Sequence, residues 1–199
     1  MNKKKIILFD IDYTLINTDL LKLKIESDLL KATGLPKNIL RNLHNKYVNR
    51  LKSTLDYNPV KFVSLLTKET SLKKNAVYKV YFNNPTLYKS CIYKDTVPLL
   101  RSLTSTCTLG IFSEGNKKFQ QTKLALSGLV RYFVPEYVFI FRRKTSPKSL
   151  LKNPSGSIIV DDNVNVIKNT EEHRKDIKTF WVNNNQSDLA TIKRLLAQL

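Results

Sequence analysis

Glycine, cysteine, histidine and acidic residues are all scarce in this sequence of 199 residues. It contains five glycines, two cysteines and two histidines, and 16 acidic residues stand against 34 basic ones. Cys91 and Cys107 show neither a metal-ligand spacing nor a disulfide pattern, and two histidines supply a zinc site poorly. A metal ion bound here is therefore expected to be a hard cation held by oxygen ligands.

Long hydrophobic runs are also missing. No apolar stretch approaches the roughly 18 residues of a membrane span. The lysine-rich residues 1–5 resemble the start of a secretion signal, but the apolar run after them stops at Asp10, and no cleavage site of small residues follows. We therefore expect a cytoplasmic protein without a membrane partner.

The net charge of +18 is large for this length. Such a field attracts anions and supports contact with nucleic acid. The lysines are spread along the whole chain, however, and asparagine is abundant too, as in residues 183–185. This pattern is typical of compositional drift, so nucleic acid stays an open but not the favoured partner. Nothing in the sequence indicates an oligomeric state.

Five short apolar runs, rich in β-branched and aromatic residues, predict the strands of a sheet. The first ends abruptly at Asp10, which is typical of a central parallel strand buried on both faces. Helical patterns separate most of the runs, so we predict an α/β fold with a doubly wound, Rossmann-like parallel sheet. The predicted strands are residues 5–9, 108–112, 137–141, 157–160 and 179–182, and the helices among them are residues 95–103, 116–126, 164–173 and 187–196.

The segment between the first two strands has only helical periodicity. Four amphipathic candidates are separated by turn signals such as Asn58-Pro59. We predict that residues 17–92 form a helical domain inserted into an α/β core made of residues 1–16 and 93–199. The connections near Ile16 and Tyr93 are expected to act as hinges. The candidate helices centre on residues 20–30, 39–51, 62–66 and 77–82.

Two of the predicted strands end in paired acids. Alternation places Asp10 and Asp12 on the same side of the chain, about 6–7 Å apart. Asp161 and Asp162 follow the fourth strand, and the carboxyl ends of parallel strands meet at one edge of a sheet. Four carboxylates there predict a Mg²⁺ site, since a cation offsets their repulsion. The alternative for the second pair, with Asn163, is a cap of the next helix.

Two other polar residues belong to the same edge. Ser113 directly follows the second strand, where a hydroxyl and free N–H groups suit an anionic oxygen. The alternative is that Ser113 is a plain helix N-cap. Lys144 stands just before Ser146 and Pro147, which predict the N-cap and first residue of a helix.

Together these motifs resemble the haloacid dehalogenase-like (HAD) hydrolase superfamily, in its phosphatase branch. Its members carry, in order, a DxDxT strand end, here completed by Thr14, a Ser or Thr, a Lys before a helix, and a late acidic pair. Residues 144–147 match the family's Lys-Pro-x-Pro apart from Thr145, which favours Lys144 over Lys148 without excluding the latter. The helical insertion is similar to the family's C1 cap.

The resemblance implies a role for each residue. Asp10 is the nucleophile that becomes an aspartyl phosphate, and Asp12 is the general acid and base. Ser113 and Lys144 are implied to hold the phosphate oxygens. The implied function is a Mg²⁺-dependent phosphohydrolase for small phosphomonoesters such as phosphorylated metabolites. The implied metal ligands are Asp10, the backbone carbonyl of Asp12, and Asp161 or Asp162, with the choice within this pair open.

Two positions depart from the family pattern. Tyr13 stands where the family very often has glycine or a small polar residue. Val166 stands four residues after Asp162, where a further acid is expected.

Other functions stay open beside this one. They are a phosphatase for phosphorylated nucleotides or nucleic-acid ends, and a non-catalytic nucleic-acid-binding module on the same fold. The charge supports both, but no RNA-recognition signature is found. Haloacid dehalogenation is disfavoured because it needs no metal and leaves Asp12 and the acidic pair without a role. The lysines expected to attract an anionic substrate to the insertion are Lys22, Lys24, Lys46 and Lys52.

Overall fold

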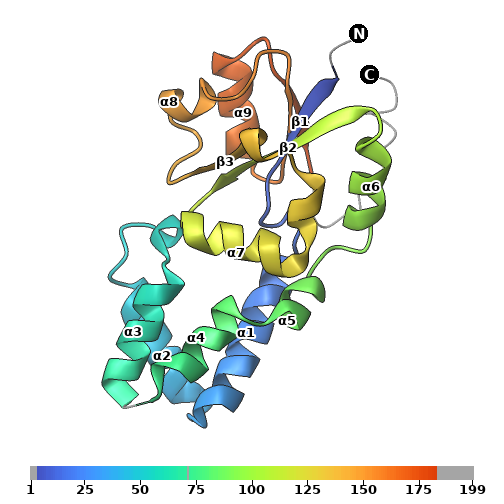
Figure 1. Ribbon diagram of the computed structural model, residues 1–199. Helices are drawn as coiled ribbons and strands as arrows, with labels where there is room; N and C mark the ends of the chain where they lie inside the picture. Colours follow the sequence, from blue (N-terminus) through green and yellow to red (C-terminus); the bar gives the residue numbers. More distant parts are fainter. Residues whose placement is uncertain (1–3, 71, 183–199) are drawn as a thin grey trace.

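The computed structural model describes residues 4–70 and 72–182, so the helix predicted over residues 187–196 lies outside the described part. Five strands form one parallel sheet in the order β3-β2-β1-β4-β5, with β1 at its centre (Figure 1). This arrangement confirms the predicted doubly wound α/β fold, and all five predicted strands are present. Their bounds are Lys5–Phe9 (β1), Cys107–Glu114 (β2), Val138–Phe141 (β3), Ile158–Asp161 (β4) and Lys178–Trp181 (β5).

The register of the central strands brings the predicted site residues to one edge. Phe9, the last residue of β1, pairs with Ile111 of β2 and with Val160 of β4. The backbone N–H of Asp10 then donates to the carbonyl of Val160 at 2.9 Å, which continues the pairing one residue further. Asp10 therefore leaves the sheet beside Asp161, although 151 positions separate the two residues in the sequence.

Alternate residues of β1 pack into two separate cores. Ile6 and Leu8 join a cluster with Val166, whereas Ile7 and Phe9 join the cluster on the opposite face. Both faces are covered, which explains why β1 is apolar throughout. Val166 is completely buried in this packing, so the position where the family expects an acid belongs to the core. The helices of this part are α6 (Thr96–Leu103), α7 (Lys117–Ser127), α8 (Pro147–Leu150) and α9 (Val164–His173), with short 3₁₀ turns at Leu129–Tyr132 and Pro135–Tyr137.

Gly110 allows β2 to approach the turn that precedes β3. A Cβ atom at this position would lie 2.4 Å from the carbonyl oxygen of Tyr137 and 2.7 Å from a methyl carbon of Leu8. Backbone cannot give way at such a distance, so only glycine fits here.

The four helices predicted within residues 17–92 are all present and lie together on one side of the sheet (Figure 1). Two shorter elements were not predicted, because a single turn is too short to show a period. No strand occurs between α1 and α5 in the described residues. The bounds are Thr18–Thr33 (α1), Lys37–Val48 (α2), Pro59–Thr70 (α3) and Lys74–Phe82 (α4), and the unpredicted elements are α5 (Pro85–Lys89) and a 3₁₀ turn at Thr54–Asp56.

The two expected hinges lie side by side. Ile16 and Ile92 form an isolated antiparallel bridge, and the N–H of Tyr93 donates to the carbonyl of Leu15 at 3.2 Å. The chain therefore leaves and re-enters the sheet region through one paired connection. A division into an inserted domain and a core at this connection remains our prediction.

A second link between the two regions comes from ion pairs. The carboxylate of Asp56, which follows α2, lies 2.7 Å from Arg142 and 2.9 Å from Arg143. These arginines directly precede Lys144 in the loop after β3. The helical segment is thus tied to the loop that carries one of the predicted site residues.

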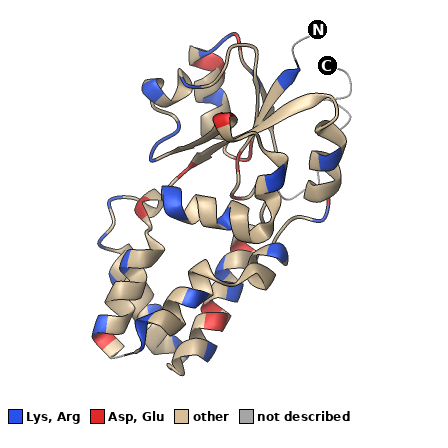
Figure 2. Ribbon diagram, viewed as in Figure 1, with Lys and Arg blue, Asp and Glu red and all other residues tan. Residues whose placement is uncertain are grey.

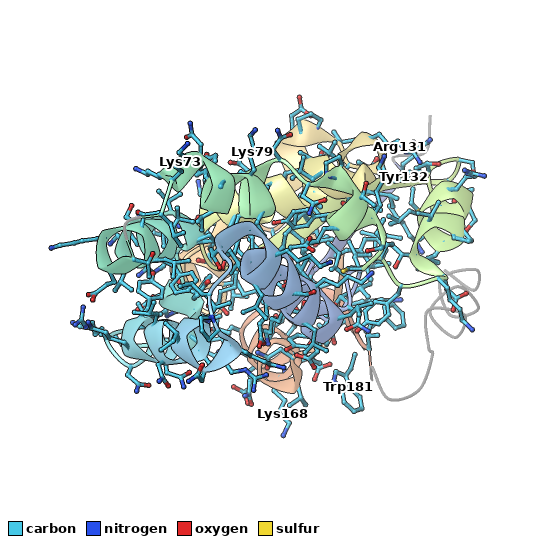
Figure 3. All side chains as sticks on the ribbon, turned by 90° about the horizontal axis from the view of Figure 1, so that it is seen from below. Lys73, Lys79, Arg131, Tyr132, Lys168 and Trp181 are labelled. Carbon is cyan, nitrogen blue, oxygen red and sulfur yellow. The ribbon has the colours of Figure 1, made fainter. Side chains whose placement is uncertain are left out.

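Basic residues occur in both the sheet and the helical regions (Figure 2). Lys73 and Lys79 extend from one edge of the molecule and Lys168 from the opposite edge (Figure 3). This scatter matches the compositional interpretation of the net charge. No helix in the described ranges is long and apolar enough to cross a membrane.

Candidate active site

The centre of the site is an ammonium group between two carboxylates. Lys144 Nζ donates to Asp10 Oδ1 at 2.8 Å and to Asp161 Oδ2 at 2.5 Å. All three residues are buried, with exposed fractions of 4% or less. The loop after β3 is therefore what brings Lys144 to the ends of β1 and β4. Lys148, the alternative lysine, is exposed on α8.

The predicted acidic groups also meet at this place. Asp10, Asp161 and Asp162 each offer a carboxylate oxygen, and these oxygens lie within 4.8 Å of one another. Thr14, which ends the first motif, donates its hydroxyl to Asp162 Oδ1 at 3.4 Å. Asn163 is the N-cap of α9 and accepts from the N–H of Asn165. The acidic pair is therefore not needed to cap this helix.

The charges of this cluster do not cancel. Three carboxylates face the single ammonium of Lys144, so ionisation of all of them leaves a charge of −2 in a buried place. Burial raises the pKa of Asp161 to about 7, with Lys144 opposing and Asp10 reinforcing the rise. Burial and the charge of Asp10 raise the pKa of Asp162 to about 6. The donor set thus fits a divalent cation in its charge, its oxygen chemistry and its spacing.

Burial also acts on Lys144. It would lower the pKa of the ammonium by itself, but the adjacent charges of Asp10 and Asp161 reverse the effect and raise that pKa. Lys144 is accordingly a fixed positive charge within reach of the Asp10 carboxylate.

Asp12 is held by three side chains that sequence reasoning missed. Lys123 Nζ lies 2.6 and 2.7 Å from its two carboxylate oxygens, Gln120 donates at 2.7 Å, and Thr18 donates at 2.7 Å. Burial alone would raise the pKa of Asp12, but Lys123, Gln120 and Thr18 outweigh it and keep that pKa below its ordinary value. The Asp12 carboxylate is therefore oriented separately from the cluster around Lys144.

One signal for these partners was present in the sequence. Gln120 and Lys123 are three residues apart on a helix that begins just after Ser113, so they share a face near the sheet edge. In a chain with 34 basic residues, however, nothing in the sequence sets Lys123 apart.

Ser113 lies inside β2 and is completely buried. Its hydroxyl has no hydrogen-bond partner in the described part of the chain, and Asn116 caps α7 in its place. The N-cap alternative for Ser113 is therefore wrong. The next residue, Glu114, accepts a hydrogen bond from the backbone N–H of Lys144 at 3.1 Å and helps to place its loop.

The contacts of Tyr13 account for a tyrosine at a position where the HAD family often has glycine or a small polar residue. Its φ angle of 57° lies in the left-handed region, where glycine is favoured. The tyrosine hydroxyl donates to Asp19 at 2.6 Å and accepts from Lys22 at 2.6 Å. Contacts of the side chain thus compensate for a backbone conformation that costs a non-glycine residue about 1 kcal/mol or more.

A cavity of about 910 Å³ opens from this cluster toward the helical segment. Of the predicted site residues, Asp10, Asp12, Lys144 and Asp162 line it, whereas Ser113 and Asp161 are buried and do not. Of the four lysines expected to attract substrate, only Lys22 lines this cavity. Lys24 and Lys46 bond instead to Ser90 and Glu69.

The fold of the chain is similar to that of several solved structures. A Bacillus subtilis protein bound to magnesium, YfnB, assigned as a HAD-hydrolase, is 17% identical, with a TM-score of 0.58 over 92% of this chain and 88% of its own. A Thermotoga maritima protein assigned as a beta-phosphoglucomutase is 14% identical, with a TM-score of 0.58 over 98% and 99%. The 2-haloacid dehalogenase of Pseudomonas syringae pv. tomato is 16% identical, with a TM-score of 0.63 over 98% and 99%.

The chain has the HAD hydrolase fold. The likeness is structural, because no protein-family model and no curated protein matches the sequence. The HAD fold places Asp10 at the end of the central strand, as the motif order predicted. The named counterparts include both a mutase and a dehalogenase, so the fold by itself leaves the reaction open.

Proposed function

We propose that this protein is a Mg²⁺-dependent phosphohydrolase that cleaves phosphomonoesters through an aspartyl phosphate on Asp10. The observation that carries the proposal is the buried cluster of Asp10, Asp161 and Asp162 around Lys144, with Asp12 held beside it. A nucleophilic carboxylate, a fixed ammonium and a set of carboxylate oxygens suited to a divalent cation fit phosphoryl transfer to a carboxylate.

The metal would be held by carboxylates already in place. Asp10 and Asp162, both of which line the cavity, together with Asp161 offer the oxygens, and the backbone carbonyl of Asp12 is a further ligand in this proposal. When bound, Mg²⁺ supplies positive charge that offsets repulsion between the Asp10 carboxylate and an anionic substrate. The magnesium bound to the B. subtilis counterpart supports this choice of ion.

The protein's own residues account for the remaining steps. An oxygen of Asp10 forms a bond to phosphorus while the bond from phosphorus to the ester oxygen breaks. Asp12 is ionised in the resting protein, so it must first take up a proton from solvent; it gives this proton to the departing oxygen and in the second step takes one from the water that releases phosphate. Lys144 holds the phosphate oxygens, and we assign Ser113, whose hydroxyl is unpartnered, to the same task.

Dehalogenation is the rival reaction, because three structurally similar proteins are named 2-haloacid dehalogenases. Two features favour phosphoryl transfer. Asp12 is fixed by Lys123, Gln120 and Thr18 in a position to move protons, and the acidic pair closes a cation site next to Asp10. Dehalogenation needs no metal ion, so a cation site next to Asp10 favours phosphoryl transfer.

The first prediction concerns the nucleophile. The purified protein should release phosphate from 4-nitrophenyl phosphate with Mg²⁺ and lose this activity with a chelator. Asp10→Asn should keep the fold but retain less than about a hundredth of the activity, because an amide cannot form the acyl phosphate. Asp176→Asn, which changes an exposed carboxylate outside the cavity, is the control and should be fully active.

Two results would overturn the proposal. One is unchanged phosphate release by Asp10→Asn in a folded sample, as judged by circular dichroism. The other is halide release from a 2-haloacid without any phosphate release from aryl, sugar or nucleotide phosphates.

A further inference from the structure

The cavity beside the candidate active site has two chemically different ends. At one end are Asp10, Asp12, Asp162 and Lys144, which suit a phosphate group and its metal ion. The other end reaches between the helices of the segment that follows β1. Both ends belong to one continuous space of about 910 Å³, so a single ligand can occupy them together.

The wall on the helical side is mainly apolar. Leucine, isoleucine, valine and phenylalanine side chains from three helices and the turn after α2 converge on it. The residues that form this apolar wall are Leu21, Ile25, Leu40, Val48, Leu51 and Phe62.

The charged and phenolic groups on this side are already paired with one another. Arg41 Nε donates to Glu26 at 2.8 Å, so these two charges neutralise each other. The hydroxyl of Tyr57 bonds to that of Tyr81 at 2.9 Å. His44 and Thr54 are further polar side chains on this side, so the preference for an apolar ligand rests on the larger number of apolar lining residues.

The volume of the cavity also favours a large apolar ligand. Cavities of about 300 to 1,000 Å³ enclose ligands as large as a drug molecule. At about 910 Å³, this one lies near the upper end of that range, and a two- or three-carbon phosphate would leave most of the space unfilled. Leu21, Leu40 and Phe62 are already buried, so an apolar group would gain the free energy of leaving water mainly against the partly buried Val48 and Leu51.

We infer that the substrate is a phosphomonoester of an alcohol with a long apolar chain or apolar rings. The inference rests on the proposed function, because the phosphate end is defined by the candidate catalytic residues. The apolar wall formed by Leu21, Ile25, Leu40, Val48, Leu51 and Phe62 is then the element that determines specificity.

The test is a series of n-alkyl phosphates from ethyl to octyl. Each methylene that moves from water into an apolar site improves binding by about fourfold. The value of kcat/KM should therefore rise along the series, by at least about 100-fold in total, mainly through a lower KM. Glycerol phosphate and glucose phosphate should be poor substrates. A flat series, or a preference for the polyol phosphates, would overturn the inference.

Substitutions in the apolar wall test whether it causes the dependence of kcat/KM on alkyl chain length. Leu51→Asn should reduce the octyl-to-ethyl ratio of kcat/KM by about tenfold, because a polar amide replaces apolar contact. Val48→Asn is a second variant in case Leu51→Asn does not fold. Leu151→Asn is the matched control, since Leu151 is 73% exposed and lies outside the cavity. An unchanged ratio in both folded cavity variants would contradict the assignment of this wall.

Binding without turnover separates this inference from the proposed function. Octylphosphonate and ethylphosphonate cannot be hydrolysed, and their affinities can be measured by calorimetry in the presence of Mg²⁺. If no phosphate ester is cleaved but octylphosphonate binds at least about 100-fold more tightly, the apolar site stands and the proposed function fails. If phosphate esters are cleaved but the two phosphonates bind equally tightly, the proposed function stands and the apolar site is wrong.

Discussion

At the residue scale, the backbone conformation of Tyr13 should affect the stability of the protein. Its φ angle of 57° lies in the left-handed region, while its hydroxyl is tied to Asp19 and Lys22. Both Tyr13→Gly and Tyr13→Ala lose these side-chain contacts, but only glycine is free of the backbone strain. We therefore predict that Tyr13→Gly is more stable than Tyr13→Ala by about 1 kcal/mol in urea unfolding.

A control pair of variants at Tyr132 should show the opposite order. Tyr132 lies in a 3₁₀ turn and has no positive φ angle, so alanine should be the more stable replacement there, by about 0.5–1 kcal/mol. An alanine advantage at Tyr13 as well would mean that its backbone is unstrained in solution.

At the scale of one element, α7 contributes a face to the site through Gln120 and Lys123. Removing Lys123 leaves the Asp12 carboxylate, which is 24% exposed, without its counter-charge. Breaking a fully buried pair costs about 3–5 kcal/mol and an exposed pair less than about 1, so Lys123→Met should cost about 2 kcal/mol. Adding Asp12→Asn to Lys123→Met should restore part of this stability, because the uncompensated charge is removed.

Urea unfolding of the two single variants and the double variant measures this coupling. Lys117→Met is the control on the same helix, because Lys117 is exposed and does not line the cavity. If the effects of the two single changes simply add, the bond between Lys123 and Asp12 does not exist in solution.

At the scale of the whole molecule, the helical segment decides what reaches Asp10. This residue is 4% exposed at the inner end of a cavity that the helices cover. A monomeric phosphate can enter it, whereas a polymer can insert only its end. We therefore predict faster phosphate release from naphthyl phosphate than from 5′-phosphorylated DNA, despite the net charge of +18.

Phosphate release from both substrates should be compared between about 50 and 200 mM salt. A preference for the DNA ends that falls steeply with salt would favour the nucleic-acid alternative, because counterion release dominates such binding. Weak dependence on salt and a preference for the monomer would support the enclosed site.

The elements and the order of the motifs could be predicted from the amino-acid sequence. Apolar runs marked the five strands, helical periodicity marked α1 to α4, and paired acids marked the ends of β1 and β4. These features depend on neighbours within a few residues, because periodicity and strand ends are local. Elements of a single turn, such as α5, carry no such period and were missed.

Which side chains meet in the site depends on the fold of the whole chain. Asp12 and Lys123 are 111 positions apart, and Asp10 and Lys144 are 134 apart, so no local pattern relates them. The choice of Lys144 over the exposed Lys148, the burial of Val166 and the apolar cavity all depend on how the strands align and where the helices lie. Packing selects a few partners among many chemically equal residues, and that selection requires the folded chain.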